Sequence, residues 1–308
     1  MILKKKQTAF LRAKGKALLQ IMRIGLVGTA LSNMISALLL SQGTEILFPL
    51  WKKSLLSCLV FSLPYICITL SLYPAGMVLN DIVDYHKDQK WFPHRPLPSG
   101  QLTLKAAWIL GIALLITGSG ASFFLPWKSQ NYFWLTLLCI LLYSFLLKQK
   151  VLLGSLSMAG CRFFHYAIPF GALAFPCWLV LFYTFWITLI SYTEKEWWKY
   201  KQKVLFLFPL FLSALGGYAF FATHPKAFFM AIIAFIIFLS PFLFGIWKAD
   251  SGEKIGENIA GLIQGFIFLD MAILAGKFGS LWVIFWLLWL LPWLGRIVRR
   301  ILAMERRS

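Results

Sequence analysis

The sequence is poor in charged residues and poorer still in acidic ones. Only 13% of its 308 residues are charged, and 11 Asp and Glu stand against 30 Lys and Arg, which gives a net charge of +19. The chain is 60% hydrophobic and 17% aromatic, with a mean hydropathy of +0.75. A soluble domain cannot bury that much apolar surface. The composition therefore excludes an ordinary soluble protein and predicts an all-α, polytopic membrane protein.

Cysteine and histidine are also scarce. The five cysteines lie in apolar stretches without CxxC spacing, and the four histidines form no HxxxH or HExxH pattern. We therefore expect buried free thiols rather than disulfides, and no transition-metal site.

Ten apolar segments are candidate membrane spans. They run near 21–41, 54–79, 104–126, 131–147, 152–174, 176–193, 204–222, 227–247, 258–276 and 280–294. We predict one bundle of nine to ten transmembrane helices over residues 21–294, between a basic tail at 1–20 and another at 295–308.

Basic residues concentrate in alternate connections. With the N-terminus inside, the loops near 80–103, 148–151, 194–203 and 248–257 share one side and carry ten lysines and Arg95, whereas 126–128 and 223–226 are nearly uncharged. This distribution follows the positive-inside rule and fits contact with anionic lipid. It predicts a multi-pass protein of the inner (plasma) membrane with the basic loops cytoplasmic, and it accounts for the charge without a nucleic-acid partner.

An acidic cluster stands at the end of the second segment, where Asn80, Asp81, Asp84 and Asp88 precede the turn that contains Arg95. On one helix, positions 81, 84 and 88 would share a face. Like charges this close need a cation, and oxygen ligands open to solvent suit Mg²⁺ with substrate phosphate oxygens. Arg95 would add a fork for phosphate. The alternative is a solvated loop that caps two helices.

The NDIVDYHKD stretch followed by RPLPSG resembles the first motif of the UbiA superfamily of intramembrane prenyltransferases. A second match is the YxxxxK pattern of Tyr143 and Lys148, followed by Leu153-Gly154. The resemblance implies that Lys148 faces a diphosphate and that Asn33 lies beneath the site. Taken alone, Lys148 could be a snorkelling lysine and Asn33 a helix-packing residue.

The second acidic motif departs from this family. The segment 188–196 reads TLISYTEKE, with Glu194 and Glu196 in place of aspartates. Positions i and i+2 point to different helix faces, so at most one is expected at the cavity, and we favour Glu196 as a metal ligand. The alternative is an interfacial loop with aromatic and basic residues.

Arg162 lies inside the fifth apolar segment. An arginine within the membrane is costly, which makes it a candidate for substrate binding. The Cys161-Arg162 pair and the SYTEKE variant resemble the UbiA-like branch found in Ebo gene clusters. Asp270, a lone acid in the ninth segment, could pair with Arg162.

The resemblance implies Mg²⁺-dependent transfer of an isoprenyl group from a prenyl diphosphate to a hydrophobic or aromatic acceptor. In that reading Asp81, Asp84 and Asp88 hold the metal, Lys148 assists catalysis, and Asn80, Arg95, Tyr143, Lys148, Arg162 and Asn33 bind substrate. One alternative is a non-catalytic member that binds a hydrophobic or prenylated metabolite and assists its handling or export. Another is a transporter, although its acidic cluster would be expected near the bilayer midplane.

Overall fold

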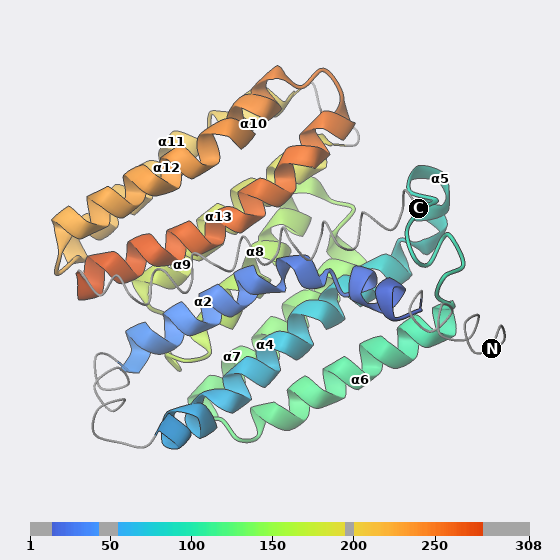
Figure 1. The fold of residues 1–308 in the computed structure, drawn as a ribbon, viewed down its shortest axis with the longest axis horizontal. Helices are drawn as coiled ribbons and strands as arrows, with labels where there is room; N and C mark the ends of the chain where they lie inside the picture. Colours follow the sequence, from blue (N-terminus) through green and yellow to red (C-terminus); the bar gives the residue numbers. More distant parts are fainter. Residues whose placement is uncertain (1–13, 43–54, 195–199, 280–308) are drawn as a thin grey trace, which may run out of the picture.

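The computed structural model describes residues 14–42, 55–194 and 200–279, and its elements within these ranges are helical (Figure 1). The elements are α2 (Ile24–Gln42), α4 (Leu55–Val83), α5 (Tyr85–Trp91), α6 (Leu104–Ser122), α7 (Trp127–Leu142), η2 (Tyr143–Leu147), α8 (Val151–Ala167), α9 (Phe175–Thr193), α10 (Lys201–Leu205), α11 (Phe208–Tyr218), η4 (Ala219–Phe221), α12 (Pro225–Lys248) and α13 (Gly252–Phe278).

The predicted all-α membrane bundle is confirmed. Over the described ranges, eight helical stretches are long and apolar enough to cross a membrane. With 17 residues, α8 makes a ninth at the short end of the spanning range. The predicted tenth segment at 280–294 lies outside the described residues, as do the terminal stretches 1–13 and 295–308.

Six helices form an inner ring. In order around the ring, α2, α4, α7, α8, α9 and α13 each pack on the next, and α13 packs back on α2. Outside this ring, α6 packs on α4, α11 on α9 and α12 on α13. Burial follows this division in most helices, because 83% of the span in α13 and 56% of those in α2, α4 and α9 are buried but only 17% of the spans in α6 and α12. The exception is α7, whose span belongs to the ring but is only 22% buried. Residues on the inner faces therefore surround a shared central space.

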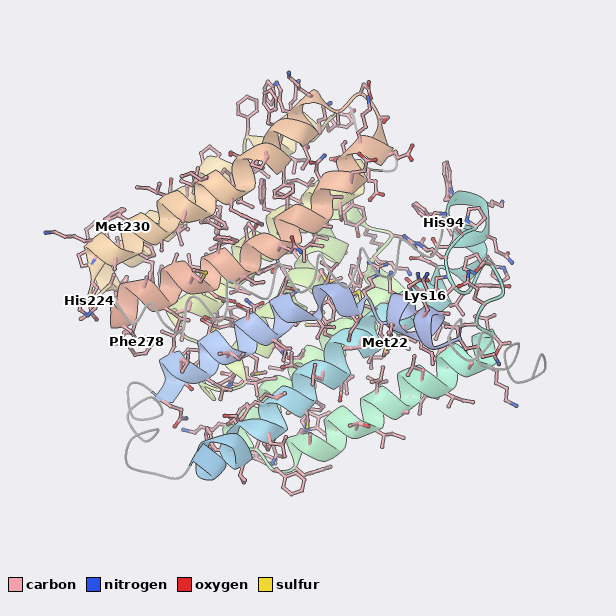
Figure 2. All side chains as sticks on the ribbon, in the orientation of Figure 1. Lys16, Met22, His94, His224, Met230 and Phe278 are labelled. Carbon is pink, nitrogen blue, oxygen red and sulfur yellow. The ribbon has the colours of Figure 1, made fainter. Side chains whose placement is uncertain are left out.

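Successive spans alternate in direction, so the connections gather at two opposite ends. Figure 2 shows Lys16 and His94 at one end of the bundle and His224, Met230 and Phe278 at the other. In Figure 1, α5 lies at the same end as Lys16 and His94. The predicted alternation of the loops is therefore reproduced, with the acidic motif and the segment 223–226 on opposite ends.

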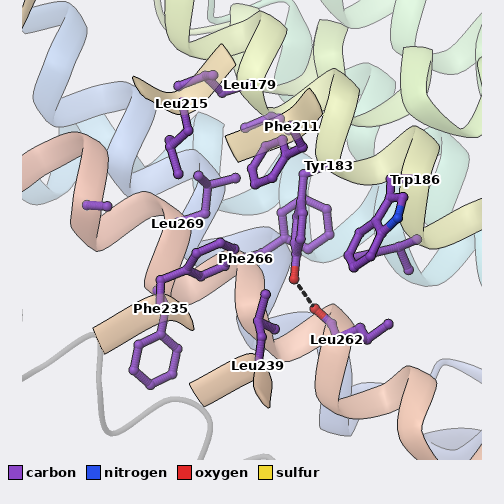
Figure 3. Close-up of a cluster of buried hydrophobic side chains, with 14 of the residues drawn as sticks. Leu179, Tyr183, Trp186, Phe211, Leu215, Phe235, Leu239, Leu262, Phe266 and Leu269 are labelled. Carbon is purple, nitrogen blue, oxygen red and sulfur yellow. Dashed lines mark hydrogen bonds between the residues drawn. The ribbon is translucent and has the colours of Figure 1, made fainter. Parts of the chain in front are cut away.

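An aromatic core centred on Tyr183 ties the inner and outer helices together (Figure 3). Its ring centroid lies 5.2 Å from that of Phe211, 5.6 Å from that of Phe235 and 4.8 Å from that of Phe266. The Tyr183 hydroxyl donates a hydrogen bond to the Leu262 carbonyl oxygen at 2.7 Å. One side chain thus joins α9, α11, α12 and α13, and stabilises the wall of the central space.

Candidate active site

A cavity of about 740 Å³ occupies the centre of the ring and is lined by side chains from all six inner helices. This volume is typical of a site for a small molecule or cofactor. At the end of the bundle where α5 lies, its lining is polar, with Arg23, Asn80, Asp84, Lys87, Arg95, Lys148 and Glu194. Deeper in the bundle, the lining is mainly apolar and aromatic, with Leu72, Tyr73, Ile140, Met158, Ile187 and Phe266 among its residues. The cavity therefore suits a molecule with a charged head and an apolar tail.

Lys148 joins the two sequence motifs. Its Nζ atom lies 2.9 Å from Asp84 Oδ1 and 3.3 Å from both the backbone oxygen and the Oδ1 atom of Asn80. The side chains of Lys148 and Asp84 are only 10% and 17% exposed, so water screens their attraction less than at an open surface. The Tyr192 hydroxyl donates to the Lys148 carbonyl oxygen at 2.6 Å and holds the backbone of this turn. The proximity of Asn80, Asp84 and Lys148 at the cavity agrees with the prediction.

A π-helical turn explains the spacing of the second motif. In an α-helix, residues five apart point about 140° away from each other. Here α7 continues into the π-turn η2, in which the Lys148 amide donates to the Tyr143 carbonyl oxygen at 3.1 Å. Such a turn adds one residue per hydrogen-bonded loop, and it brings Tyr143 and Lys148 to the same cavity.

The spacing predicted that the three motif aspartates share one continuous helix face, and this prediction is wrong. The helix α4 ends at Val83, and Asp84 occupies the break before α5. Of the three, Asp84 alone lines the cavity. Asp81 and Asp88 are buried beside it, where Asp81 Oδ1 pairs with Arg23 at 3.2 Å and Asp88 Oδ2 pairs with Arg95 at 2.5 Å. Each carboxylate thus has its own cation from another part of the chain.

Arg23 is a site residue that the sequence reasoning missed. It stands at the break before α2 with a φ of 48°, which is a left-handed conformation that non-glycine residues adopt only when the surroundings impose it. This backbone places its guanidinium at the cavity and beside Asp81. Burial is the largest single influence on the pKa of Arg23 and lowers it, but the charge and hydrogen bond of Asp81 together with Tyr73 and Tyr143 outweigh burial, so the net shift is upward. The sequence offered one indication of this role, which is that a charged residue stands at the start of the first apolar segment.

The acidic residues match Mg²⁺ in kind. Among the described residues, no group of three or more His, Cys, Asp or Glu side chains converges enough to hold a metal by itself. Mg²⁺ does not require this, since one or two carboxylates with phosphate oxygens and water complete its shell. Asp88 Oδ1 is buried without a hydrogen-bond partner, so one carboxylate oxygen is still available to a ligand. The donor set therefore fits Mg²⁺ that is shared with a phosphate-bearing substrate.

The altered second motif reaches the cavity through Glu194. Glu194 packs against the first turns of α13, where a Cβ atom on Gly256 would come within 2.6 Å of Glu194 Oε1. Glycine at this position permits the close approach. Glu196 lies outside the described residues, and its role as a metal ligand stays a prediction.

A polar network lies deeper in the bundle around Arg162. Its Nη1 donates to Asn33 Oδ1 at 2.7 Å and its Nη2 donates to Thr29 Oγ1 at 2.9 Å. Asn33 Nδ2 lies 3.0 Å from Oδ1 and 2.9 Å from Oδ2 of Asp270. Asp270 Oδ2 also accepts a hydrogen bond from the Ser32 hydroxyl at 2.6 Å. The predicted direct pair of Arg162 with Asp270 is thus replaced by a bridge through Asn33, because the amide can accept from one residue and donate to the other.

Comparison with known proteins places these features in a family. The model of the UbiA prenyltransferase family matches residues 30–193, which is more than half of the chain. Digeranylgeranylglyceryl phosphate synthase of Saccharolobus solfataricus is 32% identical over 188 residues, which are 58% of this chain and 62% of that protein. The enzyme of the same name from Sulfurisphaera tokodaii is 29% identical over 149 residues, covering 47% and 48%. The match thus spans less than two thirds of these relatives.

The fold gives an independent likeness. A solved structure of digeranylgeranylglyceryl phosphate synthase superimposes with a TM-score of 0.56 and 19% identity, over 85% of this chain and 98% of that one. At this identity the likeness concerns the fold alone. Together with the family match over residues 30–193, it shows that the chain belongs to the UbiA prenyltransferase family.

Proposed function

We propose that this protein is an intramembrane prenyltransferase, which transfers an isoprenyl group from a prenyl diphosphate to a hydrophobic or aromatic acceptor. One observation carries the proposal: a cluster of cationic and carboxylate side chains stands at one end of a cavity whose remainder is mainly apolar and lies between membrane spans. A diphosphate head and a polyprenyl tail have this same division of polarity. The relatives named digeranylgeranylglyceryl phosphate synthase support the same class of reaction.

The diphosphate would lie among Lys148, Arg95 and Arg23. All three line the cavity, and each now pairs with one of the motif aspartates. Arginine presents a planar fork to phosphate oxygens, whereas lysine provides a compact charge. The Arg95 guanidinium also stacks over the Phe92 ring at 4.1 Å, which restrains the orientation of its fork. Binding of a diphosphate would exchange carboxylate partners for phosphate partners.

Asp81, Asp84 and Asp88 are the proposed ligands of Mg²⁺, with a glutamate of the second motif, Glu196 in the sequence-based prediction, as a further ligand. When bound, Mg²⁺ would offset the charge of the diphosphate and make it a better leaving group. Each exchanged ion pair frees a carboxylate for the metal and a cation for the phosphate. The three motif aspartates are therefore matched by three cationic side chains.

The remaining residues would guide the reaction. The bond between the first prenyl carbon and the diphosphate oxygen breaks, and its electron pair leaves with the diphosphate. The allylic cation is then captured by the acceptor, which loses a proton. Aromatic faces stabilise such a cation, and Tyr73, Tyr143 and Phe266 line the cavity. The largely apolar walls would keep water from capturing the cation first.

The test is a transfer assay on the full-length protein in lipid nanodiscs. Geranylgeranyl diphosphate with Mg²⁺ should release diphosphate in the presence of a phenolic or glyceryl phosphate acceptor, and Asp84→Ala should abolish release. The matched control is Asp250→Ala, which removes an exposed carboxylate at the same end of the bundle. Failure of the wild-type protein to bind any prenyl diphosphate would overturn the proposal.

A non-catalytic role in handling or export of a prenylated metabolite is the second candidate. It is favoured by the three ion pairs, which give each motif aspartate a cationic partner from the protein itself. This role predicts that a prenyl compound binds but that no diphosphate is released with any acceptor. The same assay therefore separates the two candidates.

A further inference from the structure

We infer that Tyr192 is a positioning residue for Lys148: from the end of α9, its hydroxyl holds the π-turn η2 in the register that directs the Lys148 ammonium group into the cavity. The inference rests on the proposed function, because that function makes Lys148 a ligand of the diphosphate. It also gives a role to Gly154 of the second motif, which the proposed reaction does not use.

The Tyr192 hydroxyl satisfies a carbonyl group at the end of another span. The turn η2 ends at Leu147, and Lys148 caps it. Carbonyl groups in the last turn of a helix have no partner further along the same helix, so they need donors from elsewhere. Tyr192 donates to the Lys148 carbonyl oxygen at 2.6 Å, from 44 positions away in the sequence. This hydrogen bond ties the end of α9 to the end of the span that carries Lys148.

Gly154 leaves the space that this hydrogen bond needs. It stands in the first turn of α8. A Cβ atom at this position would collide with the Tyr192 hydroxyl, and it would lie 3.0 Å from the Leu147 carbonyl oxygen and 3.1 Å from Lys148 Cα. A larger residue would therefore displace either Tyr192 or the turn itself.

The register of η2 decides where Lys148 points. In the π-turn, the Lys148 amide donates to the Tyr143 carbonyl oxygen at 3.1 Å, and both side chains line the cavity. In α-helical geometry, Lys148 would point about 140° away from Tyr143. Turns of the π type are rare, so this one depends on contacts that favour it. The hydrogen bond from Tyr192 is such a contact, because it holds the peptide that follows the residue whose amide closes the π-turn.

Loss of this hydrogen bond should lower the fraction of molecules in which Lys148 lies beside Asp84. The Lys148 ammonium group, now 2.9 Å from Asp84 Oδ1, would then compete less with a metal ion for that carboxylate. It would also be less available to a diphosphate. Tyr192 itself lines the cavity, so a direct contact between its hydroxyl and the donor is the alternative. A direct contact would act without Lys148 and would not affect metal binding in the absence of donor.

The experiment uses Tyr192→Phe in the full-length protein in nanodiscs, alone and combined with Lys148→Met. In the single variant, the Mg²⁺-dependent affinity for geranylgeranyl diphosphate should fall about three- to tenfold, as expected for one lost hydrogen bond. The affinity for Mn²⁺ without donor should rise about two- to fivefold, because the competing ammonium group has moved away. In the Lys148→Met background, Tyr192→Phe should change neither affinity by more than about twofold.

Two further variants separate positioning from general damage. Gly154→Ala should reproduce both changes, since its methyl group would push Tyr192 away from the turn. Tyr218→Phe is the matched control, because it removes another buried hydroxyl that donates to a backbone carbonyl, that of Ile273 at 3.3 Å. Tyr218 ends α11 and does not line the cavity. Its variant should leave both affinities unchanged.

Three results would overturn the inference. In folded Tyr192→Phe, the affinities for Mn²⁺ and for the donor could fall together, or both could stay unchanged. The third is an effect of Tyr192→Phe that persists in full in the Lys148→Met background, which would indicate a direct contact with the donor. If Tyr192→Phe does not fold, Gly154→Ala decides the question by the same measurements. Failure of the proposed function has a different signature: the wild-type protein would bind no prenyl diphosphate, whereas the rise in Mn²⁺ affinity needs no donor.

Discussion

Lys148 Nζ lies 2.9 Å from Asp84 Oδ1, and both side chains line the cavity. The residue expected to bind phosphate thus neutralises a residue expected to bind metal. Lys148 and a metal ion compete for the same carboxylate until a diphosphate gives the lysine another partner. Metal and diphosphate should therefore bind with positive cooperativity.

Lys148→Met should change metal and donor binding in opposite directions. Without the competing ammonium group, the affinity for Mn²⁺ alone should rise about fivefold, which corresponds to an ion pair worth about 1 kcal/mol. The affinity for geranylgeranyl diphosphate should fall about tenfold or more, because a charge-assisted contact is lost. Both can be measured by Mn²⁺ electron paramagnetic resonance and by isothermal titration.

The matched control for this prediction is Lys150→Met, which removes an exposed lysine from the same connection. It should leave both affinities unchanged. A fall in the affinity of Lys148→Met for Mn²⁺ alone would contradict the competition between lysine and metal.

The sequence predicted the local part of this site well. Asn80, Asp84, Arg95, Tyr143 and Lys148 were all selected from two motifs, and all line one cavity. Motif spacing carries this information because the residues lie at the ends of spans that alternate in direction. The membrane brings every second connection to the same end, so the two motifs could be predicted to lie at one end of the bundle.

The partners of the acids could not be predicted in this way. The pairs of Asp81 with Arg23 and of Asp84 with Lys148 join residues 58 and 64 positions apart in the sequence. Their formation depends on how the spans pack around the ring, and no local period records that packing. The break of α4 before Asp84 has the same origin, since it lets each acid turn toward a different cation. The Asn33 bridge between Arg162 and Asp270 likewise depends on three helices at once.

Topology provides a second prediction. Ser99 follows the acidic motif, and Asp250 lies between α12 and α13 at the same end of the bundle, whereas Thr223 neighbours His224 at the opposite end (Figure 2). All three positions are exposed, so Ser99→Cys, Asp250→Cys and Thr223→Cys place accessible thiols at the two ends. In a background without the five native cysteines, an impermeant maleimide applied to intact cells should label Thr223→Cys only. It should label the other two variants only after the cells are permeabilised, when the reagent reaches the cytoplasmic side. The basic loops are the reason, because they favour the cytoplasmic side. Labelling of Ser99→Cys from outside would contradict the proposed orientation.

Gly265→Ala should destabilise the wall of the cavity. A Cβ atom at this position would collide with the Tyr183 hydroxyl, and Leu239 Cδ2 lies 2.8 Å from the same point. Because Tyr183 is fully buried and bonded to Leu262, it cannot move away without loss of packing. Overpacking of this kind costs about 1–3 kcal/mol, which thermal unfolding in detergent would detect.

A double variant separates the cause of this effect from a general cost of alanine. Tyr183→Phe removes the colliding oxygen, so it should recover part of the stability lost in Gly265→Ala. Gly216→Ala is the control, since no atom lies within 4 Å of the position that its Cβ would take. It should be neutral or slightly stabilising. An equal loss of stability in Gly216→Ala and Gly265→Ala would contradict the steric explanation.

The altered second motif gives the last prediction. Sequence spacing favoured Glu196 as the metal ligand, but Glu194 lines the cavity and packs against the start of α13. Glu194 directly follows the end of α9 at Thr193 and lines the cavity, so the single variants of the two glutamates should differ. We now expect Glu194→Gln to weaken Mg²⁺-dependent binding of geranylgeranyl diphosphate about tenfold, because a carboxylate ligand is lost, and Glu196→Gln to change it less than twofold.

Asp250→Asn serves as the control for loss of a negative charge at the same end, and should be silent because its carboxylate is exposed. The reverse pattern would restore Glu196 as the ligand. A silent double variant would mean that the first motif holds the metal alone, and it would favour the non-catalytic role in handling a prenylated metabolite.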